Sequence, residues 1–326
     1  MKVCLIGAGR IGAVHAIAIA GEATTTLHSV VDLHPEAAEH LAKKYNAIVL
    51  SLEQAFNNNE IDVFIIASST ASHADLIERC ARAGKPVFCE KPIDLSLDRA
   101  LSCAKVVKES GIVCMLGFNR RFDPHMASLK NKVDANVIGS IQSLIITSHD
   151  PEPPSMDYIA GSGGLFHDMM IHDFDMACWI LNDTPSCIYV AAKAANDDIA
   201  NQGDVDTASV ILNMKGGSIV TIINGRQASF GYDQRIEAFG ETGMIQVQNP
   251  LEDSVVISNA NGINQAKAKY FFLERYEKAY HNELAHFIKS VQTGVKPSVD
   301  ISDGVLALRI AEAAQKSLKT GNPVNL

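Results

Sequence analysis

Lys91 is the first side chain in this sequence whose type and position suit chemistry on a bound ligand. It stands in Glu90-Lys91-Pro92, directly after the short apolar run of residues 86–89. A lysine held between a carboxylate and a proline at the mouth of a buried strand can donate hydrogen bonds to a hydroxyl or a carbonyl of the ligand. Taken alone, Lys91 would be interpreted as a solvated loop lysine. The motifs before and after it favour the functional interpretation.

Asp168 and His172 form the second candidate group. They lie in residues 165–181, whose spacing predicts one helix, and a separation of four places them on the same helical face. Asp175 and Trp179 continue that face. A histidine beside a carboxylate is suited to take a proton from an alcohol near neutral pH.

Three other interpretations of this helix remain open at this point. His172 could be a core histidine with a local hydrogen bond, or Asp168 and His172 could be an ordinary surface pair. His167, Asp168, His172 and Asp173 could also supply metal ligands. We expect no metal, because the sequence lacks HExxH.

Length and composition limit the class of protein. A chain of 326 residues favours two domains. The net charge of −9 without a basic block gives no support to nucleic-acid binding, and no apolar run approaches the roughly 20 residues that span a bilayer. The N-terminus shows no cleavable signal pattern, and seven cysteines without CxxC pairing indicate reduced thiols. We therefore expect a cytoplasmic protein.

The N-terminal segment predicts a dinucleotide site. Residues 2–6 form an apolar strand, Gly7-Ala8-Gly9-Arg10-Ile11-Gly12 follows, and an alanine-rich helix runs through Ala20. In this GxGxxG context the glycines permit a tight turn, approach of a pyrophosphate and close packing of helix on strand. Asp32 ends the next apolar run, 20 residues after Gly12, where a carboxylate would bind the ribose 2′-hydroxyl and repel a 2′-phosphate. NAD is therefore favoured over NADP.

Strands and helices continue to alternate up to about residue 121. Strands are expected at 48–50, 61–67, 85–89 and 112–116, and helices at 36–45, 73–83 and 96–109, with Ser96 as N-cap and Gly111 as the stop. This pattern predicts a doubly wound parallel sheet, with ligands beyond the carboxyl ends of the strands. Polar residues reach that edge after the strand at 61–67: Ser68, Ser69, Thr70 and His73.

The second half has a different pattern. Strands are expected at 141–148, 186–193, 205–214, 218–224, 234–239, 244–248 and 254–257, with glycine turns at 215–217 and 240–243. Two helices, at about 274–292 and 302–320, close the chain. The expected fold is therefore α/β, with a Rossmann domain over 1–121 and an α+β domain with a mostly antiparallel open sheet over 122–326.

These motifs together resemble one known family. Gly7 to Gly12, Glu90-Lys91-Pro92, residues 117–124 (GFNRRFDP) and residues 168–173 (DMMIHD) are similar in order and spacing to the Gfo/Idh/MocA oxidoreductases. The stretches 148–151, 164–168 and 172–175 most resemble the inositol 2-dehydrogenases within that family.

The resemblance implies roles for particular residues. Lys91, Asp168 and His172 match the catalytic positions: His172 would take the hydroxyl proton, Lys91 would bind the reacting oxygen, and Asp168 would bind an adjacent hydroxyl. Glu90 would orient Lys91. The implied cofactor contacts are Gly7, Gly9, Arg10, Ile11, Gly12, Asp32, Ser68, Ser69, Thr70, His73, Glu90, Lys91 and Arg121. The implied substrate contacts are Lys91, Arg120, His149, Asp168, His172 and Tyr232.

The expected activity is NAD-dependent oxidation of myo-inositol to 2-keto-myo-inositol by a homotetramer. One alternative is a dehydrogenase of scyllo-inositol, D-chiro-inositol or glucose. Another is a dinucleotide-binding regulator without turnover, although such a protein would not need Lys91, Asp168 and His172 together.

Overall fold

The structure, a computed structural model, describes residues 1–326 and divides into two compact units. The first consists of Met1–Phe122 and Lys278–Leu308, and the second of Asp123–Glu277 and Arg309–Leu326. The sequence-based boundary at 121/122 left 278–308 in the second domain. The structure groups this segment with the first unit because Leu284, Phe287 and Ile288 of helix α12 (Glu277–Thr293) enter that unit's core. None of the helices combines the length and the apolar character needed to cross a bilayer.

The first unit is built on a six-stranded parallel sheet with strand order β3-β2-β1-β4-β5-β6. Its strands are β1 Lys2–Ile6, β2 Thr26–Val31, β3 Ile48–Val49, β4 Val63–Ile66, β5 Val87–Glu90 and β6 Cys114–Gly117. Strands β4 and β6 are buried along their whole length, as expected for a sheet covered on both faces. This strand order confirms the predicted doubly wound Rossmann sheet.

Helices complete the first unit. They are α1 Arg10–Gly21, α2 Pro35–Lys44, α3 Leu52–Phe56, α4 His73–Arg82, α5 Leu97–Ser110 and α12 Glu277–Thr293, with short 3₁₀ turns η1 Thr70–Ser72 and η2 Asn119–Phe122. The predicted ends of α5 are confirmed: Ser96 caps its first turn, and Gly111 ends it in the left-handed conformation.

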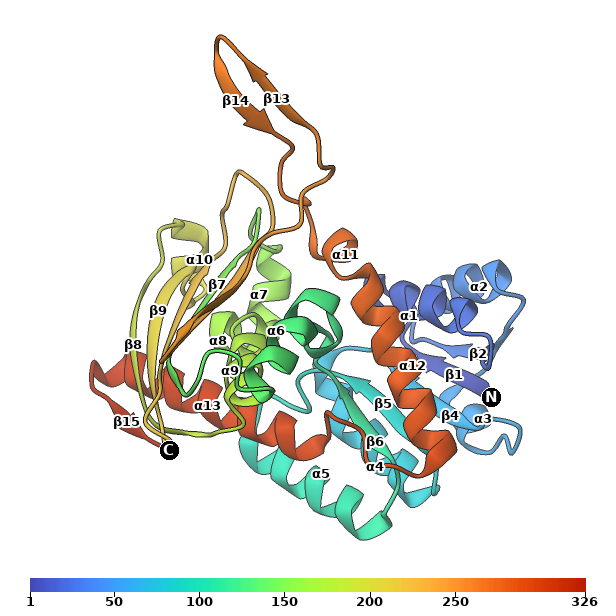
Figure 1. The fold of residues 1–326 in the computed structure, drawn as a ribbon. Coiled ribbons are helices and arrows are strands. Elements are labelled where there is room, and N and C mark those ends of the chain that lie inside the picture. The colour runs from blue at the N-terminus through green and yellow to red at the C-terminus, as the bar shows by residue number, and fades with distance from the viewer. The chain divides into compact units, whose positions relative to one another are not determined.

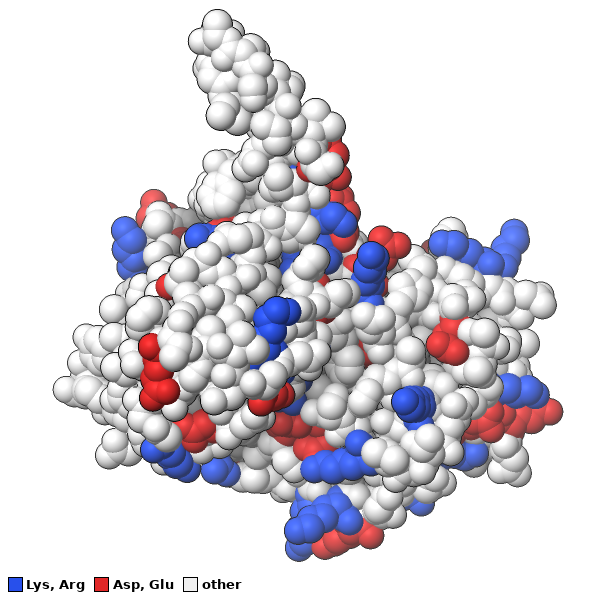
Figure 2. Space-filling view, viewed as in Figure 1, with Lys and Arg blue, Asp and Glu red and all other residues white.

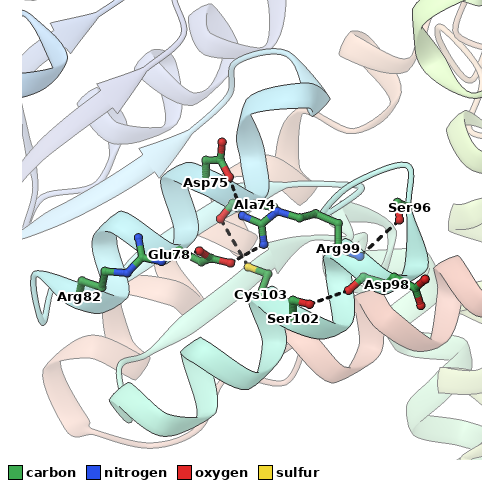
Figure 3. A network of polar contacts seen from close by, with 9 residues as sticks. All are labelled: Ala74, Asp75, Glu78, Arg82, Ser96, Asp98, Arg99, Ser102 and Cys103. Atoms are coloured by element: carbon green, nitrogen blue, oxygen red, sulfur yellow. Dashed lines mark hydrogen bonds and ion pairs between the residues drawn. The ribbon is translucent and has the colours of Figure 1, made fainter.

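A polar network joins α4 to α5 on their outer side (Figure 3). The guanidinium of Arg99 donates to Asp75 over 2.5 Å and also to Glu78. Beneath it, the thiol of Cys103 lies 3.6 Å from the carbonyl oxygen of Ala74. Arg99 therefore ties the two helices together.

The second unit contains a seven-stranded sheet with strand order β12-β11-β7-β10-β9-β8-β15. The strands are β7 Ile141–His149, β8 Pro185–Lys193, β9 Thr207–Met214, β10 Ile219–Gly225, β11 Asp233–Gly240, β12 Gly243–Val247 and β15 Val324–Asn325. Every pairing is antiparallel except that of β10 with β7. The predicted mostly antiparallel sheet is confirmed.

The helices of the second unit correct one expectation. They are α6 Pro124–Asp134, α7 Met156–Ser162, α8 Gly164–Asp168, α9 Ile171–Leu181, α10 Asp197–Asn201 and α11 Phe272–Arg275, while α13 Ile301–Thr320 belongs to both units. The single helix predicted over 165–181 is wrong, because the chain leaves the helix at Met169 and Met170. Asp168 ends α8, and His172 lies in the first turn of α9.

A hairpin of β13 Val256–Asn259 and β14 Gly262–Gln265 extends away from the seven-stranded sheet (Figure 1). The sequence predicted only one strand here, at 254–257. Residues 254–266 contain no charged side chain, and the end of the hairpin is therefore white in Figure 2.

Candidate active site

The glycine loop between β1 and α1 has the geometry of a phosphate cradle. Gly7 has φ +104°, and a Cβ there would lie 2.4 Å from the carbonyl oxygen of Ala67. A Cβ on Gly12 would lie 2.0 Å from the carbonyl oxygen of Gly7. A Cβ on Gly9, in contrast, would meet nothing within 4 Å. The outer glycines are required by packing, whereas Gly9 leaves open space in front of the N-terminus of α1, where a pyrophosphate fits.

Asp32, directly after β2, braces this loop. Its Oδ2 accepts a hydrogen bond from the backbone N–H of Ala8 over 2.6 Å, and its Oδ1 accepts one from His34 over 2.7 Å. A carboxylate fixed by two amides beside the glycine loop is in position to accept hydrogen bonds from a ribose.

The segment after β4 is held by a buried histidine. The ring of His73 is 1% exposed, with Nδ1 2.7 Å from the carbonyl oxygen of Pro92 and Nε2 3.0 Å from that of Ser68. Burial lowers the pKa of His73, and the two carbonyl oxygens oppose this shift in part. Ser68 also exchanges a hydrogen bond with Ser72, and Ser69 and Thr70 begin the η1 turn. His73 therefore links the loops after β4 and β5.

Lys91 follows the last residue of β5, and its neighbour Glu90 is held from α1. Nε2 of His15 lies 2.7 Å from Oε1 of Glu90. The His15 ring is 1% exposed and packs edge-on against Phe88, with ring centroids 5.0 Å apart. A Cβ on Gly117 would lie 2.8 Å from Oε2 of Glu90, so the neighbouring strand also confines the carboxylate. Glu90 is thus fixed on two sides at the base of Lys91.

Arg120 and Arg121 are both buried in η2. Arg121 donates from Nη1 to the carbonyl oxygen of Ser298 over 2.9 Å, and its Nη2 lies 3.0 Å from Oδ1 of Asp303. The guanidinium of Arg121 therefore ties η2 to the first turn of α13 and to the segment before it.

Asp168 in the second unit is held between a tyrosine and a buried arginine. Its Oδ1 accepts a hydrogen bond from the Tyr158 hydroxyl of α7 over 2.9 Å. Its Oδ2 lies 3.6 Å from Nη2 of Arg226, which directly follows β10. These two contacts orient the carboxylate of Asp168. Its orientation therefore does not depend on a continuous helix from Asp168 to His172.

The helix that carries His172 is anchored on the sheet through Asp173. This fully buried carboxylate accepts hydrogen bonds from Ser148 of β7 over 2.6 Å and from Asn224 of β10 over 2.8 Å. His167, on α8, is also buried, and burial lowers the pKa of its ring. No group of three His, Cys, Asp or Glu side chains is arranged to hold a metal ion.

His149 and Tyr232 lie at the same end of the sheet. His149 pairs with Gly225 and with Asp233 in the strand register, and its Nδ1 lies 3.0 Å from Oδ2 of Asp233. Burial alone would raise the pKa of Asp233, but hydrogen bonds from His149, Arg235 and Asn249 lower it below its ordinary value. The Tyr232 ring is buried edge-on against Tyr276 at 5.9 Å.

The predicted site residues divide between the two units. In the first unit, Gly7, Asp32, Ser68 and Lys91 follow β1, β2, β4 and β5 and so share the carboxyl edge of one parallel sheet. The second unit carries His149, Asp168, His172 and Tyr232.

Sequence reasoning missed His15, Tyr158 and Arg226. His15 stands three residues after Gly12 in an otherwise apolar helical stretch. A lone polar residue in such a stretch was the signal that could have identified it. For Arg226, the only available signal was a charged residue directly after the strand-like run 218–224.

The strand order, the glycine loop and Asp32 define a dinucleotide-binding domain of Rossmann type. Comparison with known families agrees with this. Residues 1–118 match the model described as "Oxidoreductase family, NAD-binding Rossmann fold", and residues 126–246 match the "GFO/IDH/MocA C-terminal domain".

Individual relatives match over the full length. The chain is 42% identical over 323 residues to an inositol 2-dehydrogenase of Rhizobium meliloti, covering 99% of this chain and 98% of the relative. It is 39% identical over 334 residues to a myo-inositol 2-dehydrogenase of Thermotoga maritima, covering 100% and 98%. The crystal structure of a myo-inositol dehydrogenase from Corynebacterium glutamicum matches with a TM-score of 0.96 at 40% identity, covering 100% of this chain and 98% of that one. The chain therefore belongs to the Gfo/Idh/MocA oxidoreductase family.

Proposed function

We propose that the protein is an NAD-dependent inositol 2-dehydrogenase that oxidises myo-inositol to 2-keto-myo-inositol (scyllo-inosose). The observation that carries this proposal is Lys91, placed after β5 on the dinucleotide edge and beside a fixed Glu90. Full-length similarity to relatives named inositol 2-dehydrogenase and myo-inositol 2-dehydrogenase supports the substrate. In this proposal residues 1–121 bind NAD, and residues 122–326 bind the polyol and form the contacts between subunits.

Each polar group of the proposed site has one task. NAD, when bound, supplies the acceptor for the hydride that leaves C2 of the inositol. His172 accepts the proton of the C2 hydroxyl, and Lys91 donates a hydrogen bond to the oxygen as negative charge develops on it. Asp168, as a carboxylate, accepts a hydrogen bond from an adjacent hydroxyl and fixes the ring orientation. Positioning of this kind provides a large share of enzymatic rate enhancement.

The remaining candidates divide between the two ligands. For NAD we propose the glycine loop, Asp32, the segment after β4 and Arg121. The loop contributes Gly7, Gly9, Arg10, Ile11 and Gly12, and the segment contributes Ser68, Ser69, Thr70 and His73. For the polyol we propose His149, Tyr232 and Arg120. Because both nitrogens of His73 face backbone carbonyls, its part would be to hold the loops in place.

Replacing Asp32 tests the assigned cofactor. Asp32→Asn removes the charge that repels a 2′-phosphate. It keeps an oxygen that can accept the hydrogen bond from the backbone N–H of Ala8. We expect the preference for NAD over NADP in kcat/KM to fall about 10- to 100-fold, the range of a hydrogen bond to a charged group. Steady-state kinetics with both cofactors measures this ratio. An unchanged preference would refute the role of Asp32.

A substrate panel separates the rival dehydrogenases. The rates with myo-inositol, scyllo-inositol, D-chiro-inositol and glucose should be compared at saturating NAD. We expect the highest kcat/KM for myo-inositol, and a higher value for another member would assign that polyol or sugar instead. If no member of the panel yields NADH, a dinucleotide-binding regulator becomes the better description.

We also propose a homotetramer, with the outer face of the seven-stranded sheet as an interface. Two rows of neighbouring side chains cross this face, and several of their members are large and exposed. One row runs through Tyr189, Ile211, Thr221 and Ile145, and the other through Ile219, Ser143, Phe239 and Met244. An apolar surface of this kind commonly marks a contact with another chain. Light scattering coupled to size exclusion should give the mass of four chains, and a clean monomer would contradict this proposal.

A cytoplasmic location is part of the same proposal. All seven cysteines are free, and six of them are buried. Burial raises the pKa of the Cys4 thiol to about 12, which keeps it protonated and unreactive. Free buried thiols are typical of proteins in reducing compartments.

A further inference from the structure

Arg226 is a buried cation whose contacts do not satisfy it. Only 1% of its side chain is exposed, yet its Nε and Nη2 have no hydrogen-bond partner in the protein. Nη2 lies 3.6 Å from Oδ2 of Asp168 and 4.0 Å from Oδ2 of Asp204. Both distances are short enough for strong Coulombic attraction but too long for hydrogen bonds.

A second buried arginine in the same unit makes a closer ion pair, although its Nε also has no hydrogen-bond partner. Arg275 is 2% exposed and donates to both carboxylate oxygens of Asp123, with Nη2 3.2 Å from Oδ1. Moving a charge out of water costs several kcal/mol. A buried ion pair recovers this cost only when its geometry is good and its polar groups are hydrogen-bonded. Arg226 is therefore a poor stabilising element by comparison, and a functional reason for its presence is needed.

The two carboxylates near Arg226 differ in their other contacts. Oδ1 of Asp204 accepts a hydrogen bond from the backbone N–H of Leu165 over 3.0 Å. Gly164 makes room for it, since a Cβ there would lie 2.6 Å from the same oxygen. Asp204 thus fixes the first turn of α8, and Asp168 is the last residue of that helix. Arg226 therefore lies beside the last residue of α8 and beside the carboxylate that holds its first turn.

We propose that Arg226 is a positioning residue that holds Asp168 as an oriented carboxylate for the polyol, and this role rests on the proposed function. Tyr158 holds one oxygen of Asp168, and Arg226 attracts the other. The attraction keeps Asp168 an acceptor of hydrogen bonds, since a protonated carboxyl would present a donor to the substrate hydroxyl.

The test compares Arg226→Met with Arg226→Lys. The methionine keeps the volume without the charge, and the lysine keeps the charge. For Arg226→Met we expect kcat/KM for myo-inositol to fall about 10- to 100-fold, with both a lower kcat and a higher KM, while KM for NAD stays within about twofold. For Arg226→Lys we expect kcat/KM to be at least about tenfold higher than for Arg226→Met, because the positive charge is what orients Asp168.

Lys130→Met is the matched control. Lys130 is a buried cation of the same unit that pairs with Asp134 and donates to Asn182 over 3.1 Å. It should lower the Tm without changing kcat/KM of the folded protein. Unchanged kcat/KM in Arg226→Met, or a lysine variant as impaired as the methionine variant, would overturn the role of Arg226. A wild-type chain that oxidises no polyol would overturn the proposed function and this role together.

Discussion

His172→Ala is expected to lower kcat about 10²- to 10⁴-fold, the usual contribution of a positioned general base. NAD affinity should stay unchanged, because the glycine loop and Asp32 belong to the first unit and His172 to the second. Single-turnover kinetics gives the chemical step, and fluorescence titration gives the Kd of NAD.

His167→Ala is the matched control for this change. His167 lies on the neighbouring helix α8, is buried, and has a pKa lowered by burial, so it has the character of a structural histidine. Its replacement should lower the Tm and leave kcat of the folded protein nearly unchanged. Equal losses of kcat and NAD affinity in His172→Ala would mean that His172 is structural as well.

Lys91→Met is expected to lower kcat/KM about 10²- to 10³-fold, comparable to the loss of one preorganised donor to a developing negative charge. The effect should fall mainly on kcat, because the donor is needed most when negative charge develops on the oxygen. Stopped-flow measurement of NADH formation isolates this step.

Lys85→Met provides the comparison for Lys91. Lys85 precedes the amino end of β5, where it donates to the carbonyl oxygen of Ile61 over 2.7 Å, while Lys91 follows the carboxyl end of the same strand. Only the carboxyl end belongs to the ligand edge of a parallel sheet. Lys85→Met should therefore keep its kcat, and a Lys91→Met variant as active as Lys85→Met would exclude Lys91 from the chemistry.

The Rossmann half could be predicted because its signals are local. The glycine loop, Asp32 at the end of the second strand and the capping of α5 by Ser96 each depend on a few neighbouring residues. The structure adds what the GxGxxG pattern could not distinguish: Gly7 and Gly12 are required by packing, whereas a Cβ on Gly9 would meet no other atom of the protein.

The parts that were missed depend on contacts between distant residues. The break at Met169 follows no local breaker, since residues 165–181 contain neither glycine nor proline. The grouping of α12 with the first unit depends on which core receives Leu284 and Phe287, and an apolar helix face does not specify its partner. Arg226 and Asp204 approach α8 from separate loops, so no spacing in the sequence brings them together.

A deuterium-transfer experiment tests directly whether the protein moves a hydride from C2 of myo-inositol to NAD. The protein should be incubated with NAD and myo-inositol that carries deuterium at C2, and the NADH should be examined by mass spectrometry and NMR. We expect one deuterium at C4 of the nicotinamide and formation of the 2-keto product. Reduced cofactor without deuterium would place the oxidation at another carbon, and no reduced cofactor at saturating NAD would contradict the proposed activity.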